Sequence, residues 1–152
     1  MAEEFFNMPV PKSVVRIFFA CAMVCGVSIV SHAQELDGLW DLRIADTKHS
    51  VKVVATIRLT EKIASESCMG GTWKRVAIEA KTVQDERFFP LAEPIAYQLE
   101  NGALTLGGTA MCDRYSLLSG KSDASNIQGT YNAVGLGTSH ALGFFSLKRV
   151  RY

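Results

Sequence analysis

LDGLWDLRI, at residues 36–44, decides the fold, because it has the pattern of the first strand of a small β-barrel. Side chains alternate between the two faces of a strand, so Trp40, Leu42 and Ile44 share one face, and that face is entirely apolar. Gly38 lets the chain bend sharply as it enters the strand. We therefore expect this face to point into the core. Trp40 is expected as a large core residue at one end of the barrel, with a ligand contact as its alternative role.

Seven further segments have the composition of strands, and most are joined by short turns. In the clearest of them, VKVVATIRLT at 51–60, apolar and polar side chains alternate as in an antiparallel sheet with one solvated face. Asn101-Gly102 supplies the two positive φ angles of a type I′ hairpin turn. The predicted fold is therefore all-β, an eight-stranded antiparallel up-and-down barrel. The strands after the first are expected at 51–60, 72–80, 95–100, 103–107, 111–120, 127–134 and 142–150.

The region before the first strand has the three parts of a secretory signal peptide. Lys12 and Arg16 form a positive flank, residues 17–30 are an apolar run, and Ser31-His32-Ala33 has the small-x-small form of a cleavage site. The apolar run is shorter than the roughly 20 residues that span a bilayer. We therefore expect cleavage after Ala33 rather than a membrane anchor.

This division predicts a signal peptide at 1–33, with Met8 as an alternative start, and one barrel domain at 34–152. The protein is then periplasmic or secreted, with no stable membrane span after cleavage. The formal net charge of +1 gives no reason to expect nucleic acid as a partner.

Two cysteines remain in the mature domain, Cys68 and Cys112. In an oxidising compartment an exported pair usually forms a disulfide. The chain-entropy estimate for such a bridge is roughly 4 kcal/mol of stabilisation. No Cys-x-x-Cys motif or histidine cluster lies nearby to favour a metal site or a reactive pair.

The sequence carries no recognisable catalytic or metal-binding constellation. Ser139 and His140 are sequence neighbours, whereas a nucleophile and its base normally come from separate segments. His49 and His140 lie far apart in the sequence, both in predicted turns. We therefore expect a protein that is not an enzyme and that holds no metal or cofactor.

The longest connection, residues 81–94, contains the apolar sequence Phe88-Phe89-Pro90-Leu91. Two interpretations are open. The segment is either a plug that folds over the end of the barrel, or a lid or partner-binding loop carried by a rigid scaffold.

The barrel interior is the candidate binding site. An eight-stranded barrel either holds one small ligand or is filled by its own side chains, and both states are open here. Tyrosine hydroxyls among apolar walls are the usual mixture of a ligand pocket. The candidate residues, from the interior and the apolar segment, are Ile57, Leu59, Phe88, Phe89, Ile95, Tyr97, Leu104, Tyr115 and Tyr131.

The two ends of the chain resemble the calycin-like barrels, which include the lipocalins and the avidin-like proteins. In lipocalins a Gly-x-Trp opens the first strand, and an arginine after the last strand packs over that tryptophan. Gly38, Trp40 and Arg149 match those positions by order, the last within GFFSLKRV at 143–150. The resemblance implies a non-enzymatic protein that binds a small apolar or amphipathic ligand, and it implies that Arg149 lies against Trp40.

Two segments are also similar to the periplasmic inhibitors of bacterial metalloproteases, which are eight-stranded barrels as well. These segments are DGLWDL at 37–42 and FFPLAEPIAYQLENGALTL at 88–106. This second resemblance implies an alternative function, an inhibitor or immunity-type protein that blocks a partner enzyme such as a protease or lysozyme through its loops.

Overall fold

The computed structural model describes residues 36–123 and 125–151. The expected signal peptide at 1–33, the alternative start at Met8 and the cleavage position lie outside the described residues. The described part of the chain contains no helix of the length and apolarity needed to cross a lipid bilayer.

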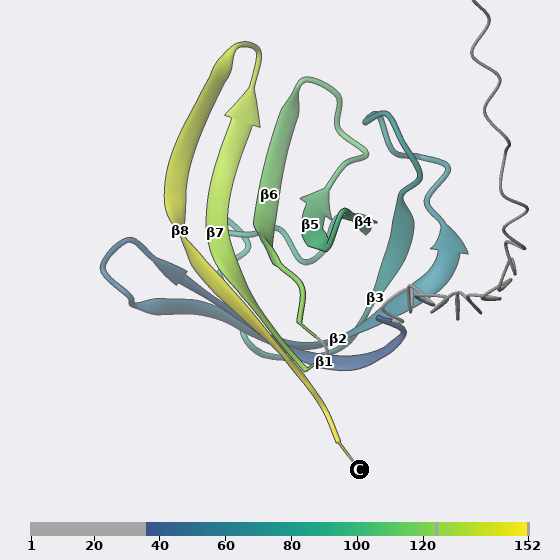
Figure 1. The fold of residues 1–152 in the computed structure, drawn as a ribbon. Coiled ribbons are helices and arrows are strands. Elements are labelled where there is room, and N and C mark those ends of the chain that lie inside the picture. The colour runs from purple at the N-terminus through teal and green to yellow at the C-terminus, as the bar shows by residue number, and fades with distance from the viewer. Residues whose placement is uncertain (1–35, 124, 152) are drawn as a thin grey trace, which may run out of the picture. The chain divides into compact units, whose positions relative to one another are not determined.

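The described chain is all-β and forms a closed antiparallel barrel of eight strands, each paired with its neighbours in sequence order (Figure 1). The first and last strands pair with each other and close the sheet, which removes exposed sheet edges at that seam. The predicted up-and-down barrel is confirmed. The strands are β1 (Gly38–Asp46), β2 (Val51–Ile63), β3 (Lys74–Val83), β4 (Ile95–Glu100), β5 (Ala103–Gly108), β6 (Arg114–Lys121), β7 (Asn126–Gly135) and β8 (Thr138–Arg149).

The two ends of the barrel differ in their connections. We call one end the mouth; it carries the connections after β1, β3, β5 and β7, at residues 47–50, 84–94, 109–113 and 136–137. The β7–β8 hairpin rises to this end at the top of Figure 1. We call the other end the base; β1 starts and β8 ends there.

The starts of two strands differ by three residues or more from the sequence-based prediction. β8 begins at Thr138 rather than at 142, because it pairs with β7 down to a two-residue turn in which Gly137 has a φ of 69°. β6 begins at Arg114 rather than at 111, because the preceding residues form a connection held by Cys112.

The barrel interior is a packed apolar core that runs from the base to below the mouth. Trp40, Leu42 and Ile44 are completely buried on the inward face of β1, as their alternation predicted. Phe89 and Leu91, from the connection after β3, are 1% and 3% exposed and belong to the same core. Full burial of such a side chain is worth roughly 1.5–3 kcal/mol. The plug interpretation is therefore confirmed for these two residues.

The plug lies beside the shortest seam of the barrel. β3 and β4 share only three residue pairs, from Lys74–Tyr97 to Val76–Ile95. Beyond Val76, the described register pairs β3 with β2 alone. The apolar 84–94 connection follows this unpaired part of the sheet and supplies the core residues that strand pairing does not.

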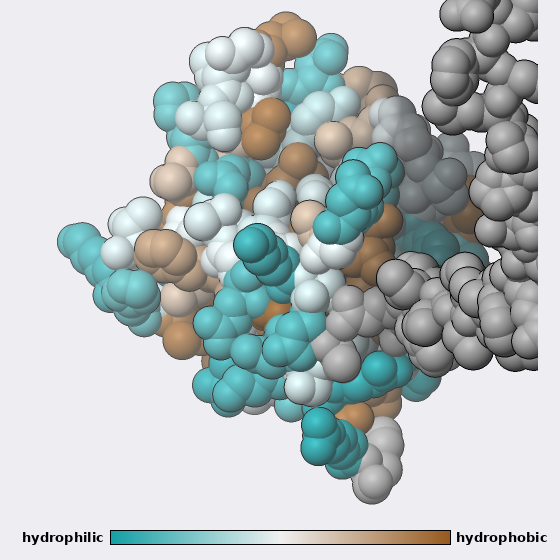
Figure 2. All heavy atoms as spheres, viewed as in Figure 1, coloured by the Kyte–Doolittle hydropathy of each residue, from teal (hydrophilic) through white to brown (hydrophobic). Residues whose placement is uncertain are grey.

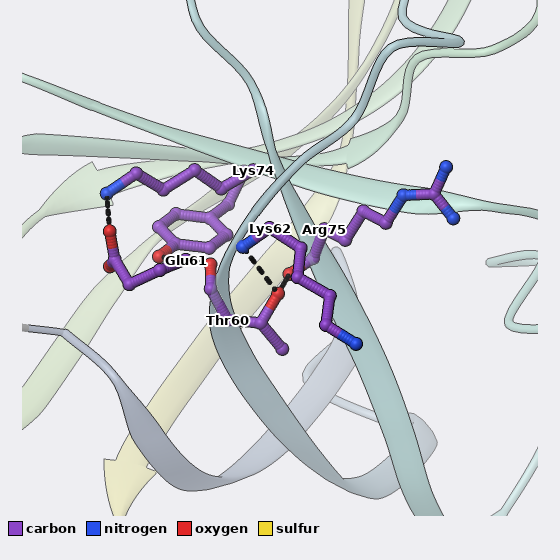
Figure 3. Close-up of polar contacts among 6 residues, drawn as sticks. Thr60, Glu61, Lys62, Lys74 and Arg75 are labelled. Carbon is purple, nitrogen blue, oxygen red and sulfur yellow. Dashed lines mark hydrogen bonds and ion pairs between the residues drawn. The ribbon is translucent and has the colours of Figure 1, made fainter.

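A β-bulge interrupts the β2–β3 pairing near the base, between the Leu59 and Ile63 pairs. A bulge leaves ladder groups without their usual partners. The hydroxyl of Thr60 replaces one of them by donating to the Arg75 carbonyl at 2.8 Å (Figure 3). The same hydroxyl oxygen accepts a hydrogen bond from the Lys62 amide. Next to it in β2, Glu61 forms an ion pair with Lys74 of β3.

The connection after β2 crosses the outer face of β4. Trp73, expected in the third strand, instead precedes β3 and is buried with Ala64 and Ala96 in a second, smaller cluster. Its indole donates to the Gly70 carbonyl at 2.9 Å. The same connection reaches the mouth, where Cys68 is disulfide-bonded to Cys112 as predicted.

The face of the barrel seen in Figure 2 carries hydrophobic residues interspersed among hydrophilic ones. Single exposed apolar residues are normal on protein surfaces. Among the described residues visible in this view, the hydrophobic ones form no large continuous patch.

Candidate functional site: a pocket at the mouth of the barrel

A cavity of about 410 Å³ lies at the mouth, between the plug connection and the upper parts of β6, β7 and β8. We call it the mouth pocket. Phe88 and Pro90 of the plug connection form one side, and Leu142 of β8 and Met111 of the 109–113 connection contribute further apolar surface. The pocket therefore sits above the packed core, at the outer end of the barrel.

The floor of the pocket exists because three small residues stand in one row of the sheet. Gly108 is paired with Ser116, and Ser116 is paired with Ala133. All three line the pocket. The next row inward contains Leu106, paired with Leu118, which fill the interior. From one inward-facing row to the next, the side chains change from large to small. The packed core therefore ends at this row, and the cavity begins above it.

Tyr131 joins the floor of the pocket to the plug. Its ring is buried, and both Phe88 and Phe89 meet it edge-on, with ring centroids 5.2 and 5.5 Å away. Its hydroxyl donates to the carbonyl oxygen of Phe88. Burial raises the pKa of the Tyr131 hydroxyl, while its hydrogen bond with Ser116 and the charge of Arg114 act in the opposite direction. The hydroxyl is therefore a neutral donor that holds the plug in place.

Four charged side chains line the pocket, and one of them is already neutralised. The carboxylate of Glu86 forms an ion pair with Lys81 at 3.4 Å and accepts from the Ala92 amide at 3.1 Å. Arg87, Arg114 and Glu93 also line the pocket. Within residues 36–123 and 125–151 their side chains make no hydrogen bond or ion pair.

The structure places only part of the predicted binding set at the pocket. Phe88, Tyr115 and Tyr131 line it. The other candidates lie in the packed core and do not line the cavity, in keeping with the alternative of a barrel filled by its own side chains. These residues are Ile57, Leu59, Phe89, Ile95, Tyr97 and Leu104.

The prediction that Tyr115 faces the barrel interior is wrong. Ser116 and Leu118 take the inward positions of β6, so Tyr115 has the opposite parity. It is half-buried at the pocket edge, and its hydroxyl accepts from the Asp113 amide at 3.4 Å. The sequence pattern of β6 is ambiguous because Leu117 and Leu118 are adjacent, and outward-facing Leu117 covers Gly107.

Sequence reasoning missed the floor residues Gly108, Ser116 and Ala133, because a small residue on a single strand gives no sign of a binding site. One signal could have found them. Each lies two positions from a large inward residue of its own strand, namely Leu106, Leu118 and Tyr131. Counting inward positions along each strand would have shown a small residue next to a large one on all three, and the register between the strands then aligns the small residues in one row.

The base holds the predicted Gly38, Trp40 and Arg149. Arg149 is the register partner of Trp40, and its guanidinium carbon lies 5.5 Å from the centroid of the indole. Gly38 has a φ of 131°, and a Cβ there would come within 3.4 Å of the guanidinium. The contact implied by the calycin-like resemblance is present, and it lies at the opposite end from the mouth pocket.

The two histidines of the described chain stand apart. His49 stacks on Phe144 with ring centroids 4.9 Å apart, and His140 is exposed on β8. Across the described ranges, no three potential metal-ligating side chains come together.

Comparisons with protein-family models, curated proteins and solved structures found no match for this chain.

Proposed function

We propose that this protein is an exported, non-enzymatic binding protein that holds one small amphipathic molecule in the mouth pocket. The observation that carries the proposal is the preformed cavity of about 410 Å³ above an otherwise packed barrel. Cavities of this size with apolar walls and a few placed polar groups are the usual form of small-molecule sites.

The lining supports an amphipathic ligand rather than a purely apolar one. Phe88, Leu142 and Met111 offer apolar contact. The Ser116 hydroxyl on the floor and the charged groups at the rim offer polar contact. A wholly apolar ligand would cover the charged groups at the rim without offering them a polar partner, which costs free energy.

Export is part of the proposal. The Cys68–Cys112 disulfide supports it, since disulfides persist in oxidising compartments such as the periplasm and the extracellular space. The contact between Arg149 and Trp40 supports a lipocalin-like kinship for the barrel.

The alternative, inhibition of a partner enzyme through the apolar 88–91 segment, has less support. Phe89 and Leu91 are core residues and are not available to a partner. Only Phe88 and Pro90 of that segment are partly exposed.

Native mass spectrometry of the exported protein tests the proposal by revealing a co-purifying small molecule. A dye-binding titration with a polarity-sensitive naphthylamine fluorophore gives an independent readout. The substitution Ala133→Leu adds a side chain to the floor row and should weaken dye binding. Ala141→Leu, on an exposed position of the neighbouring strand β8, is the matched control and should leave dye binding unchanged. Equal dye binding by the two variants would contradict the proposed site.

A further inference from the structure

Resting on the proposed function, we infer that the ligand carries an anionic head, a carboxylate or a phosphate, which Arg114 receives at the rim of the mouth pocket. The starting point is the placement of Arg114 on the inward face of β6.

Arg114 stands directly above the pocket floor. It is the first residue of β6 and has the same parity as Ser116 and Leu118, so its side chain leaves the strand on the inward side. The positive charge of Arg114 also acts on the buried hydroxyl of Tyr131. Arg114 is exposed and lines the pocket, so its guanidinium lies at the rim, where a bound ligand and solvent both reach it.

The charges around the pocket leave a positive excess for a ligand. Lys81 and the Ala92 amide already engage the Glu86 carboxylate. Arg87 and Arg114 then face one remaining carboxylate, that of Glu93. This carboxylate lies over Gly108, where a Cβ would be 3.7 Å from its oxygen, and it forms no ion pair with either arginine in the described chain. Among the described residues, two guanidiniums without an ion pair against one such carboxylate favour an anionic head.

The chemistry of arginine fits this role. A guanidinium presents donors in a planar fork that matches carboxylate and phosphate oxygens. Such a charge-assisted bond becomes stronger when a bound chain excludes water from the pocket. The rim position of Arg114 keeps the charged head accessible to solvent, so its full desolvation is not required.

The packed core fixes the orientation of the ligand. Leu106, Leu118 and Tyr131 close the barrel beneath the floor, so an alkyl chain cannot continue toward the base. The chain has to lie along Phe88 and Leu142, within the cavity, with its head at the rim. The site therefore suits short amphiphiles with one compact anionic group.

Isothermal titration calorimetry of the mature protein with four small molecules that share an eight-carbon chain tests the inference. The probes are octanoate, octyl phosphate, octanol and octylamine, measured at neutral pH and low salt. We expect both anions to bind at least about tenfold more tightly than octanol, as a charge-assisted hydrogen bond predicts. Whether octanoate or octyl phosphate binds more tightly identifies the head group.

Arg114→Gln should remove the tighter binding of the anions and leave octanol binding unchanged. Arg43→Gln, on the exposed outward face of β1, is the matched control and should behave as wild type.

The outcomes separate the two proposals. Equal affinity for the anions and octanol, or an advantage that survives in Arg114→Gln, would overturn the anionic-head inference while the pocket stands. Tighter binding of octylamine would overturn it in favour of Glu93 as the selecting group. Failure of all four probes to bind would contradict both the inference and the proposed function. Circular dichroism of Arg114→Gln shows that the variant is folded before it is titrated.

Discussion

Arg149 lies against the indole of Trp40, and the two residues are direct register partners across the seam that closes the barrel. The indole nitrogen donates to the Leu36 carbonyl at 2.9 Å, and the guanidinium donates to the Asp37 carbonyl. The pair therefore ties the entry of the first strand to the end of the last. The two side chains cover the base end of the β1–β8 seam, whose seven residue pairs close the sheet.

A double-mutant cycle measures the strength of this contact. Trp40→Ala should lower the free energy of unfolding by about 3–5 kcal/mol, because it removes a fully buried ring and leaves a cavity. Arg149→Ala should cost less, about 0.5–2 kcal/mol, because stacking and carbonyl contacts are lost without a large cavity. Chemical denaturation should show that the two effects are not additive. Lys148→Ala, at the exposed neighbouring position, is the control, and additive effects of the first pair would contradict the coupling.

The disulfide should contribute substantially to stability. It joins residues separated by 44 positions, and the chain-entropy estimate for a loop of that length is roughly 4 kcal/mol. The double variant Cys68→Ala/Cys112→Ala should therefore unfold at lower denaturant concentration than wild type, with a loss of about 2–5 kcal/mol. Reduced wild type should match the variant, and the variant itself should be insensitive to reductant. Two free thiols in the denatured, unreduced protein would rule out the bridge.

Two buried tyrosines should make the barrel sensitive to alkaline pH. Burial raises the pKa of Tyr97 and of Tyr131, so the folded protein keeps protons that the unfolded chain loses above about pH 10. Their contribution to stability is complete below that pH, and the free energy of unfolding should fall as the pH rises above it. The Tyr97→Phe/Tyr131→Phe variant should show a shallower fall between about pH 10 and 12 in urea titrations. An unchanged fall of stability in the double variant would contradict the role of the two buried tyrosines.

Close approach of β6 and β7 should make Gly129 intolerant of any side chain. Gly129 is paired with Gly120, and a Cβ at Gly129 would lie 2.0 Å from the Ser119 carbonyl oxygen. Gly129→Ala has to push the two strands apart and should cost about 1–3 kcal/mol of stability. Gly70→Ala, with no atom within 4 Å of the new methyl group, should change stability by less than about 0.5 kcal/mol. Similar melting temperatures for the two variants would show that the strands can separate at no cost.

Export should remove residues 1–33. The protein secreted by, or released from the periplasm of, a bacterial host should have the intact mass of a chain that starts at Gln34. Replacing the small residue at the cleavage position, as in Ala33→Arg, should block processing and retain the longer mass. A wild-type mass that still includes residues 1–33 would contradict the signal peptide.

The sequence by itself determined the strand count, the closed barrel and the pairing of Cys68 with Cys112. These follow from local rules: period-two alternation in β1 and β2, the Asn101-Gly102 turn, and the presence of only two cysteines after Ala33. The contact between Trp40 and Arg149 followed from position as well, because first and last strands must meet when a barrel closes.

Only the tertiary structure decided which part of the barrel is filled and where the cavity lies. Phe89 and Leu91 enter the core because the short β3–β4 seam leaves apolar surface to cover, which no local pattern records. Gly108, Ser116 and Ala133 line the pocket because three separate strands bring them into one row. Tyr115 was predicted to face the interior because the adjacent Leu117 and Leu118 make either face of β6 a possible inward face. The pairing of β6 with its neighbours decides between them. Register between strands is a long-range property, and it alone decides which small residues combine into a pocket.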